Sequence, residues 1–296
     1  MNVVHAGVFL LLAVWAATSC AAEHAIYTLA DGEARVMRKT TWYRLEPGAR
    51  AERGDIVEAG EREQVLLELP HAAIVGIVGP SVLYAETLAD EAKPAPVALM
   101  LLRGWLKFSN VSKAPPIVLS LPGATLKLAD GIVVVHCDPT HTEFFVERGR
   151  VILVAPAARG KDALRDATDG EFWHRLGDRA FESDDHPTMA FVTAMPPAFR
   201  DTLPSLASHF ETPPPPLAAG REVTFAEAAP WLTVSAATRR AFARRFATSL
   251  SDPAFRAQAA AAHPIPEWDR TLHPERYRPR QDAGPAASNA VTAPIR

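Results

Sequence analysis

The sequence predicts a mainly β fold, followed by a smaller α-helical region towards the C-terminus. Residues 97–154 contain successive runs of four to six residues, rich in β-branched and aromatic side chains and separated by Gly and Pro, as is typical of short strands. Beyond the prolines at 213–216, residues 235–250 place Phe242 and Phe246 on one helical face. Hydrophobic residues make up 48% of the 296 residues, so the chain can bury a sizeable core.

The first 22 residues read as a secretory signal peptide. Residues 7–17 form an uncharged apolar run that is short for a transmembrane helix, and the small residues 18–22 follow it. Residues 17–20 also resemble a bacterial lipobox, with Ala at the first position where Leu is usual. Three outcomes stay open: cleavage to a soluble protein, lipidation of Cys20 that attaches the protein to a membrane, or an uncleaved anchor. In each case we expect the protein in the periplasm or associated with the outer membrane.

The cysteine content fits an exported chain without an internal disulfide. Once the leader is removed or Cys20 is lipidated, Cys137 is the remaining cysteine. It lies beside His136 in a strand-like run, where a lone cysteine is typically a small core residue. We therefore expect Cys137 to be buried and unreactive.

Strand-sized runs also precede residue 97. They occur at residues 27–38, 56–59, 64–69 and 73–84, and Gly-Asp, Gly-Glu, Pro-His and Gly-Pro pairs divide them. The β-domain is therefore expected to begin near residue 27.

The order of these features resembles the FecR domain over residues 30–155. The matching positions in the first half are Gly32, Ala34, Val36, Gly48, Gly54, Asp55, Ile56, Leu67, Leu69, Gly79 and Pro80. The second half continues the resemblance at residues 102–106, 121–124, 130–134 and 146–151. The resemblance implies a β-rich, extracytoplasmic domain without catalytic activity.

The FecR family is best known from membrane-bound regulators that relay a signal from an outer-membrane receptor to an anti-sigma segment, and it also occurs in exported envelope proteins. In this sequence the apolar run begins within the first ten residues, which departs from the regulator pattern. The resemblance therefore favours an exported envelope protein over a sigma-factor regulator.

We expect a FecR-like β-domain at 27–155, a linker with a short helix at 156–195, a helical region at 196–280 and a disordered tail at 281–296. The short helix is expected near 170–176 and another at 198–210. Thr224 and Glu227 have the spacing of a capping box, and Asp252 with Pro253 is a typical helix start.

Residues that bear reactive groups are few. His136, Cys137, Asp138 and His141 are metal-binding residue types, but alternate strand residues point to opposite faces and Asp138 precedes a proline, so a plain hairpin is expected. Glu182, Asp184, Asp185 and His186 have Ser and Pro neighbours that indicate a solvated loop. We predict no catalytic residue, no metal ligand and no cofactor.

Two sets of residues are candidates for a binding surface. Trp105, Phe108 and Phe144 would line an aromatic groove, unless they are core residues of the strands. Arg239, Arg240, Arg244 and Arg245 would meet an anionic partner, unless they form a solvated helix face. A net charge of −3 together with export argues against nucleic acid.

Three functions remain open. The leading hypothesis is an exported, non-enzymatic envelope protein whose β-domain binds another envelope protein or a cell-wall component. The alternative is a membrane-retained signalling component that modulates a regulator. The third is an envelope hydrolase, which would require His136, Asp184 and His186 to converge in the fold.

Overall fold

The computed structural model describes residues 24–70, 73–88, 96–110, 116–156, 162–210, 216–262 and 264–277. The predicted signal peptide, Cys20 and the predicted tail at 281–296 lie outside these ranges.

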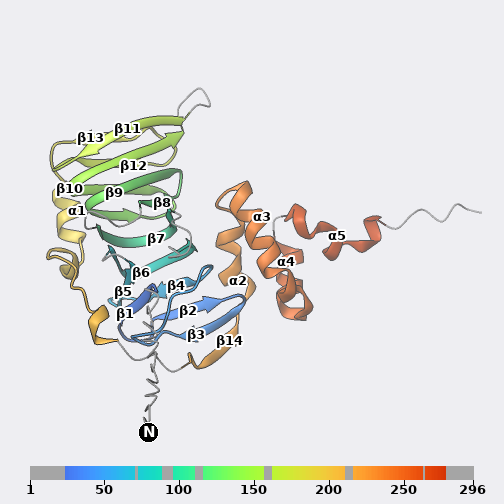
Figure 1. The fold of residues 1–296 in the computed structure, drawn as a ribbon. Coiled ribbons are helices and arrows are strands. Elements are labelled where there is room, and N and C mark those ends of the chain that lie inside the picture. The colour runs from blue at the N-terminus through green and yellow to red at the C-terminus, as the bar shows by residue number, and fades with distance from the viewer. Residues whose placement is uncertain are drawn as a thin grey trace, which may run out of the picture.

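The predicted fold class is confirmed: within the described ranges, fourteen strands form one sheet and short helices follow (Figure 1). The strand order is β13-β12-β10-β9-β8-β7-β6-β4-β2-β3-β14, with β11 beside β10, β5 beside β6 and β1 beside β5. The strands are β1 (Ile26–Ala30), β2 (Arg35–Arg38), β3 (Thr41–Arg44), β4 (Ile56–Ala59), β5 (Gln64–Leu69), β6 (Ala73–Thr87), β7 (Val97–Asn110), β8 (Ile117–Leu121), β9 (Ala124–Cys137), β10 (His141–Pro156), β11 (Asp162–Thr168), β12 (Phe172–Leu176), β13 (Glu182–Asp184) and β14 (Ala219–Glu222). The α-helices are α1 (Met189–Ala194), α2 (Phe225–Ala228), α3 (Ala236–Arg245), α4 (Pro253–Ala261) and α5 (Asp269–Leu272).

Four long strands, β6, β7, β9 and β10, bend in the middle and so contribute to two layers. The first half of β6 pairs with β5 and the second half with β4. Gly104 lies at the bend of β7 with φ +100°, and a Cβ there would lie 2.1 Å from Ser81 Oγ. Gly131 and Gly149 face each other at the bends of β9 and β10. Glycine is needed at these bends because the backbones come close together and φ is positive.

The largest core lies between the two layers. It contains inward-facing residues of both halves of the long strands, such as Leu99 and Leu106 of β7 and Val135 and Val151 of β9 and β10. Cys137 belongs to this core, with its Sγ donating to the carbonyl of Leu101 at 3.7 Å. The prediction of a buried, free Cys137 is confirmed.

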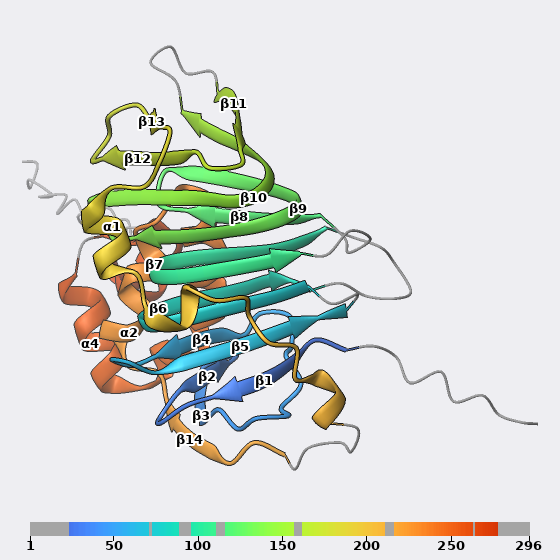
Figure 2. The ribbon, with the colours of Figure 1, turned by 90° about the vertical axis from the view of Figure 1, so that its left-hand side faces the viewer.

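One outer face is covered by α1 and the segment that follows it, which Figure 2 shows crossing the strands. The side chains of Phe191, Phe199 and Leu203 are buried there against the sheet. Two buried charged residues fix this segment. Lys107 Nζ donates to the carbonyls of Phe199 at 2.8 Å and Asp201 at 3.0 Å, and Glu68 accepts from Ser205 Oγ at 2.7 Å.

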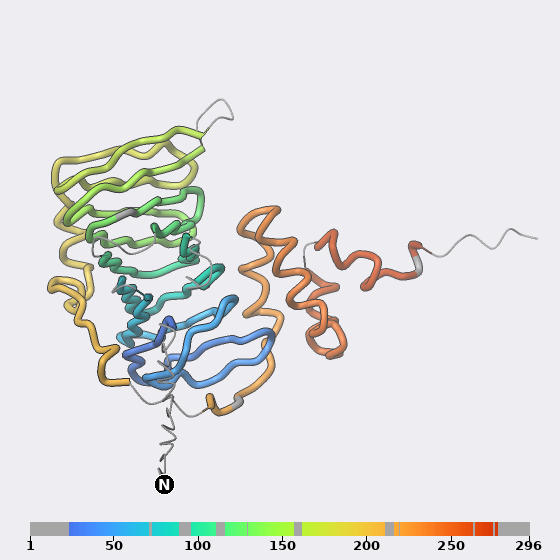
Figure 3. The backbone as a smooth tube through the Cα atoms, viewed as in Figure 1, coloured from blue at the N-terminus to red at the C-terminus, as the bar shows by residue number. Residues whose placement is uncertain are grey.

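The opposite outer face is covered by the C-terminal helices, which stand beside the strands in Figures 1 and 3. Phe242 and Phe246 of the predicted 235–250 helix pack against residues of β2, β4 and β7, so its predicted apolar face is confirmed. The helix α3 ends at Arg245, and a 3-10 helix (Phe246–Ser251) continues it. The capping box of Thr224 and Glu227 and the Asp252 cap are also present.

Several predicted boundaries were wrong. Residues 156–195 are not a linker, because β11 and β12 pair with β10 and extend the sheet. The helix expected at 170–176 is strand β12. The helix expected at 198–210 is largely irregular with two short 3-10 turns, because Lys107 and Glu68 bind backbone groups of this segment. Residues 196–280 are not wholly helical either, since β14 pairs with β3.

Candidate functional site

The three aromatic residues predicted to line a groove do not share a surface. Trp105 points outward beneath α1 and contacts Phe191, with ring centroids 5.1 Å apart. Phe108 and Phe144 point inward and are fully buried in the core between the layers. Positions 105 and 108 are an odd number of residues apart, so their side chains leave opposite faces of β7. These aromatic residues are therefore packing residues, and the predicted aromatic groove is absent.

The four arginines of α3 have different surroundings. Arg245 donates to the carbonyls of Lys39, Gly54 and Met37, which ties the helix to two turns of the β-domain. Arg239 pairs with Glu267 at 3.2 Å. Arg240 and Arg244 are exposed. The helix therefore docks through Phe242, Phe246 and Arg245, and two arginines remain available to solvent.

An open groove of about 500 Å³ runs between α3 and the face of the sheet that the C-terminal helices cover. We call it the α3 groove. It is lined by Tyr84, Glu86, Met100, Ser120, Leu121, Gly123, Ala124, Thr125, Val154, Pro156, Asp162, Val234, Ser235, Ala237, Thr238, Ala241 and Phe242. Strands β6 to β11 form one wall and the helix forms the other. The groove exists only because the helical region docks on the β-domain, and its volume lies in the range of ligand-binding clefts.

The lining of the α3 groove is mixed in polarity and acidic in charge. Its described lining residues include two exposed carboxylates, Glu86 and Asp162, and no Lys or Arg. Burial raises the pKa of Tyr84 above its ordinary value, which is itself well above neutral pH, so its hydroxyl is protonated and can donate a hydrogen bond. The described lining of the α3 groove is therefore net negative.

A larger cavity of about 950 Å³ lies at the turns that Arg245 binds. At its wall, Arg38 pairs with Glu52 and with the buried Asp55, and Tyr27 donates to Asp55 at 3.1 Å from the core side. Burial raises the pKa of both Asp55 and Tyr27. These groups pair with one another, so the network holds the turns in place.

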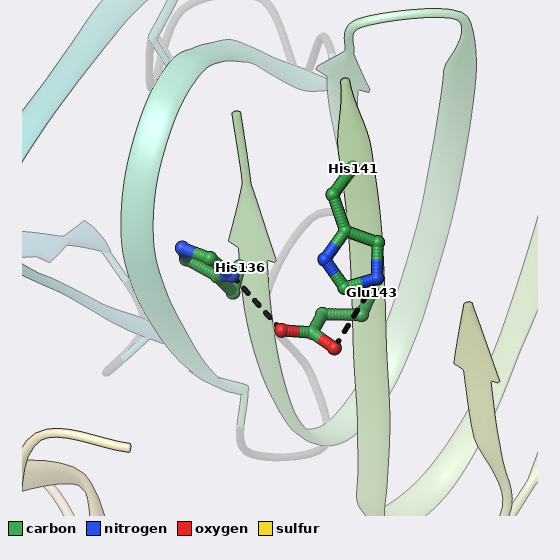
Figure 4. Close-up of side chains that lie close together, drawn as sticks. All are labelled: His136, His141 and Glu143. Atoms are coloured by element: carbon green, nitrogen blue, oxygen red, sulfur yellow. Dashed lines mark hydrogen bonds and ion pairs between the residues drawn. The ribbon is translucent and has the colours of Figure 1, made fainter. Parts of the chain in front are cut away.

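The hairpin of β9 and β10 brings His136, His141 and Glu143 together (Figure 4). His136 is the register partner of Glu143, and His141 lies two residues before Glu143 on the same strand, so all three side chains leave the same face. His136 Nδ1 lies 2.9 Å from Glu143 Oε1, and His141 Nε2 lies 3.6 Å from Glu143 Oε2. Cys137 points to the opposite face, as expected. This group is called the hairpin cluster below.

The hairpin turn and a neighbouring ring position the cluster. Asp138 Oδ1 accepts from the backbone N–H groups of Thr140 and His141, at 2.6 and 2.7 Å. Burial alone raises the pKa of Asp138, but these hydrogen bonds outweigh it and lower the pKa. The Trp105 ring stacks on the His136 ring with centroids 4.4 Å apart. The predicted plain hairpin is therefore present, and Glu143 is the residue that sequence reasoning missed.

The solvated loop predicted around residues 182–186 is partly a strand, because Glu182 and Asp184 lie in β13, which pairs with β12. The side chains of Glu182, Asp184, Asp185 and His186 are exposed, as predicted. Asp184 lies 3.3 Å from the Nε2 of His174 on the neighbouring strand. His136 pairs with Glu143 instead, so the hydrolase constellation of His136, Asp184 and His186 does not form. Burial also raises the pKa of the Cys137 thiol, which keeps it unreactive.

No helix in the described ranges combines the length and apolarity needed to cross a membrane.

No protein-family model matches the chain, and neither does any curated protein. Two solved structures from Parabacteroides distasonis, each described as a candidate anti-sigma factor, are similar to part of it. The first is 13% identical to this chain, with a TM-score of 0.39, and the match covers 47% of this chain and 64% of that structure's chain. The second is 12% identical, with a TM-score of 0.38, and the match covers 44% of this chain and 59% of that structure's chain. Both matches span less than two thirds of the other protein, and neither supports an assignment of family or function.

Proposed function

We propose that this protein is an exported, non-enzymatic binding protein of the bacterial envelope, and that the α3 groove holds a basic, extended segment of a partner protein. The observation that carries the proposal is the α3 groove itself. Two parts of the chain that are distant in sequence form its walls, and carboxylates of Glu86 and Asp162 lie along it. Opposite charge on a partner would speed its association and favour it over acidic competitors.

The shape of the groove supports an extended segment as the occupant. Its sheet wall crosses several strands, and its helix wall includes the small side chains of Ala237 and Ala241. An extended peptide of about ten residues is roughly 33 Å long and presents alternate side chains to one wall. The apolar run at 7–17 and the small residues at 18–22 support export.

Fluorescence anisotropy with defined peptides tests the groove. The probe is an extended peptide of alternating Lys and Val, and the comparison peptide has Glu in place of Lys. We expect the Lys peptide to bind and to weaken as salt rises, because exposed charges are screened. Ala241→Trp fills the groove and should weaken binding at least about tenfold, the equivalent of 1.4 kcal/mol. Ala247→Trp, at an exposed position outside the groove lining, is the matched control.

Two results would overturn the proposal: equal binding of the Lys and Glu peptides, or unchanged binding by Ala241→Trp. If the Lys peptide is bound through the groove, affinity capture from the envelope fraction then identifies the natural partner, with Ala241→Trp as the negative control.

The alternative function is a membrane-retained signalling component that modulates a regulator. The lipobox-like residues 17–20 favour it. Cell fractionation of Cys20→Ala tests the membrane retention that this alternative requires. A protein held at the membrane through Cys20 should become soluble on this substitution, and a cleaved soluble protein should not change its location.

A further inference from the structure

The hairpin cluster lies on the outer face beneath α1, the face opposite the one that the C-terminal helices cover. We propose that His136, His141 and Glu143 bind a divalent transition-metal ion of the zinc class. The proposal is independent of the α3 groove.

The first argument is geometric. The ligand atoms of the three side chains all lie within 4.8 Å of one another. Tetrahedral zinc, with bonds of about 2.0–2.2 Å, places neighbouring ligand atoms about 3.3 Å apart. The contacts of Glu143 with His136 at 2.9 Å and with His141 at 3.6 Å lie on either side of that spacing. Binding of an ion would bring the more widely spaced ligand atoms, which lie within 4.8 Å of one another, closer together by side-chain rotation.

The second argument is the charge of Glu143. Its side chain is 10% exposed, and a buried carboxylate needs a compensating positive charge. Among the described residues, its side-chain partners are the imidazoles of His136 and His141, and no Lys or Arg pairs with it. A divalent cation bound between the three side chains would supply that charge.

The third argument is that the site is already rigid. His136 and Glu143 are fixed by the ladder between β9 and β10, and stacking on Trp105 limits the rotation of the His136 ring. The hydrogen bonds to Asp138 fix the backbone at His141. Metal sites require ligands that are held in place by their surroundings, so this rigidity favours binding.

The ligand set selects the kind of ion. Two imidazoles and one carboxylate suit zinc and its neighbours among the transition metals, whereas calcium and magnesium prefer oxygen ligands alone. His136 and His141 keep 24% and 34% of their side chains exposed. The fourth coordination position therefore faces solvent, where water or a side chain of a partner can occupy it.

Calorimetric titration of the chelator-treated full chain with ZnCl2 tests the site. We expect one equivalent of zinc to bind and to raise the melting temperature, because a ligand of the folded state stabilises it. Loss of a residue that only supports a metal ligand costs about 10–100-fold, so His141→Ala and Glu143→Gln should each weaken binding at least about tenfold. His209→Ala, at an exposed histidine outside the hairpin cluster, should bind zinc as the unmodified chain does. MgCl2 and CaCl2 should give no comparable binding.

The variants separate metal binding from folding. His136→Ala also removes a stacking partner of Trp105, so it is less informative than His141→Ala, whose ring is about one third exposed. The circular dichroism spectrum of His141→Ala should match that of the unmodified chain. Zinc binding that occurs only at millimolar concentration, or that is equal in the unmodified chain and His141→Ala, overturns the proposal.

Discussion

The guanidinium of Arg245 donates to the carbonyl of Lys39 at 2.6 Å, although 206 residues separate them in the sequence. The same group donates to Gly54 at 2.5 Å and to Met37 at 3.1 Å. One side chain thus satisfies three carbonyls of the β-domain from the end of α3. The α3 groove depends on this contact because it holds one wall against the other.

Replacing Arg245 should undock the helical region. Arg245→Ala leaves three carbonyls without their donor, and hydrogen bonds to charged groups contribute about 1.5–3 kcal/mol each, so we expect a loss of at least about 2 kcal/mol in the free energy of unfolding. Arg244→Ala, at the neighbouring exposed arginine, should change it by less than about 0.5 kcal/mol. Urea denaturation measures both. Equal effects of the two substitutions would contradict the docking role of Arg245.

Phe246 should be a larger determinant of the same docking. It is fully buried and stacks against Phe242 with ring centroids 5.8 Å apart. Phe246→Ala creates a cavity and should cost about 3–5 kcal/mol. Thr248→Ala, exposed in the following 3-10 helix, is the control and should cost less than about 0.5 kcal/mol. A small effect of Phe246→Ala in urea denaturation would mean that the helices do not rest on this residue.

Lys107 should hold the segment after α1 in place. Its Nζ contacts both carboxylate oxygens of Glu147 and two backbone carbonyls, and the residue is 1% exposed. Lys107→Met removes one partner of a buried pair and should cost about 3 kcal/mol or more. It should also speed proteolysis within residues 196–206, whereas Lys127→Met at an exposed position should not. Unchanged cleavage rates would refute this role.

Glu227 should make the free energy of unfolding decrease as the pH falls below 4.5. Burial alone raises the pKa of Glu227, but hydrogen bonds from Arg221 and Thr224 outweigh it and lower the pKa from 4.5 to about 2. The stabilising effect is therefore fully present above pH 4.5 and is lost as the pH falls towards 2.

Urea denaturation between pH 7 and pH 2 measures this dependence. Glu227→Gln should remove most of the pH dependence of the free energy of unfolding below pH 4.5. Glu61→Gln, at an exposed position, should leave this dependence unchanged. The same slope in both variants would rule out Glu227 as the responsible group.

The strand runs were predictable from the sequence because β-branched residues form them and Gly and Pro residues separate them locally. The sequence does not predict whether a given glycine lies in a turn between two strands or at a bend inside one strand. The sequence pattern places glycines between strand runs, but Gly104 lies at a bend inside β7, where Ser81 of another strand comes close to its backbone. In β12, Phe172 and Leu176 fit a helix as well as a strand, and pairing of Trp173 with Phe144 decides for the strand.

The candidate site residues were likewise predictable only where a local pattern marks them. The spacing of Phe242 and Phe246 predicted the docking face of α3, but nothing local distinguishes Arg245 from Arg244. Only the fold shows which of them meets three carbonyls. Glu143 was missed because its pairing with His136 follows from the hairpin register, which depends on the length of the turn at Asp138.

The pairing of β3 with β14 has a consequence for how the chain is made. Thr41 and Glu222 are partners across 181 residues, so one edge of β3 stays unpaired until most of the polypeptide has emerged. An unpaired strand edge is a template for pairing with other molecules, and pairing between distant segments forms slowly. Newly made chains therefore expose this edge of β3 until residue 222 is in place, and a truncation that ends before β14 leaves the edge open permanently.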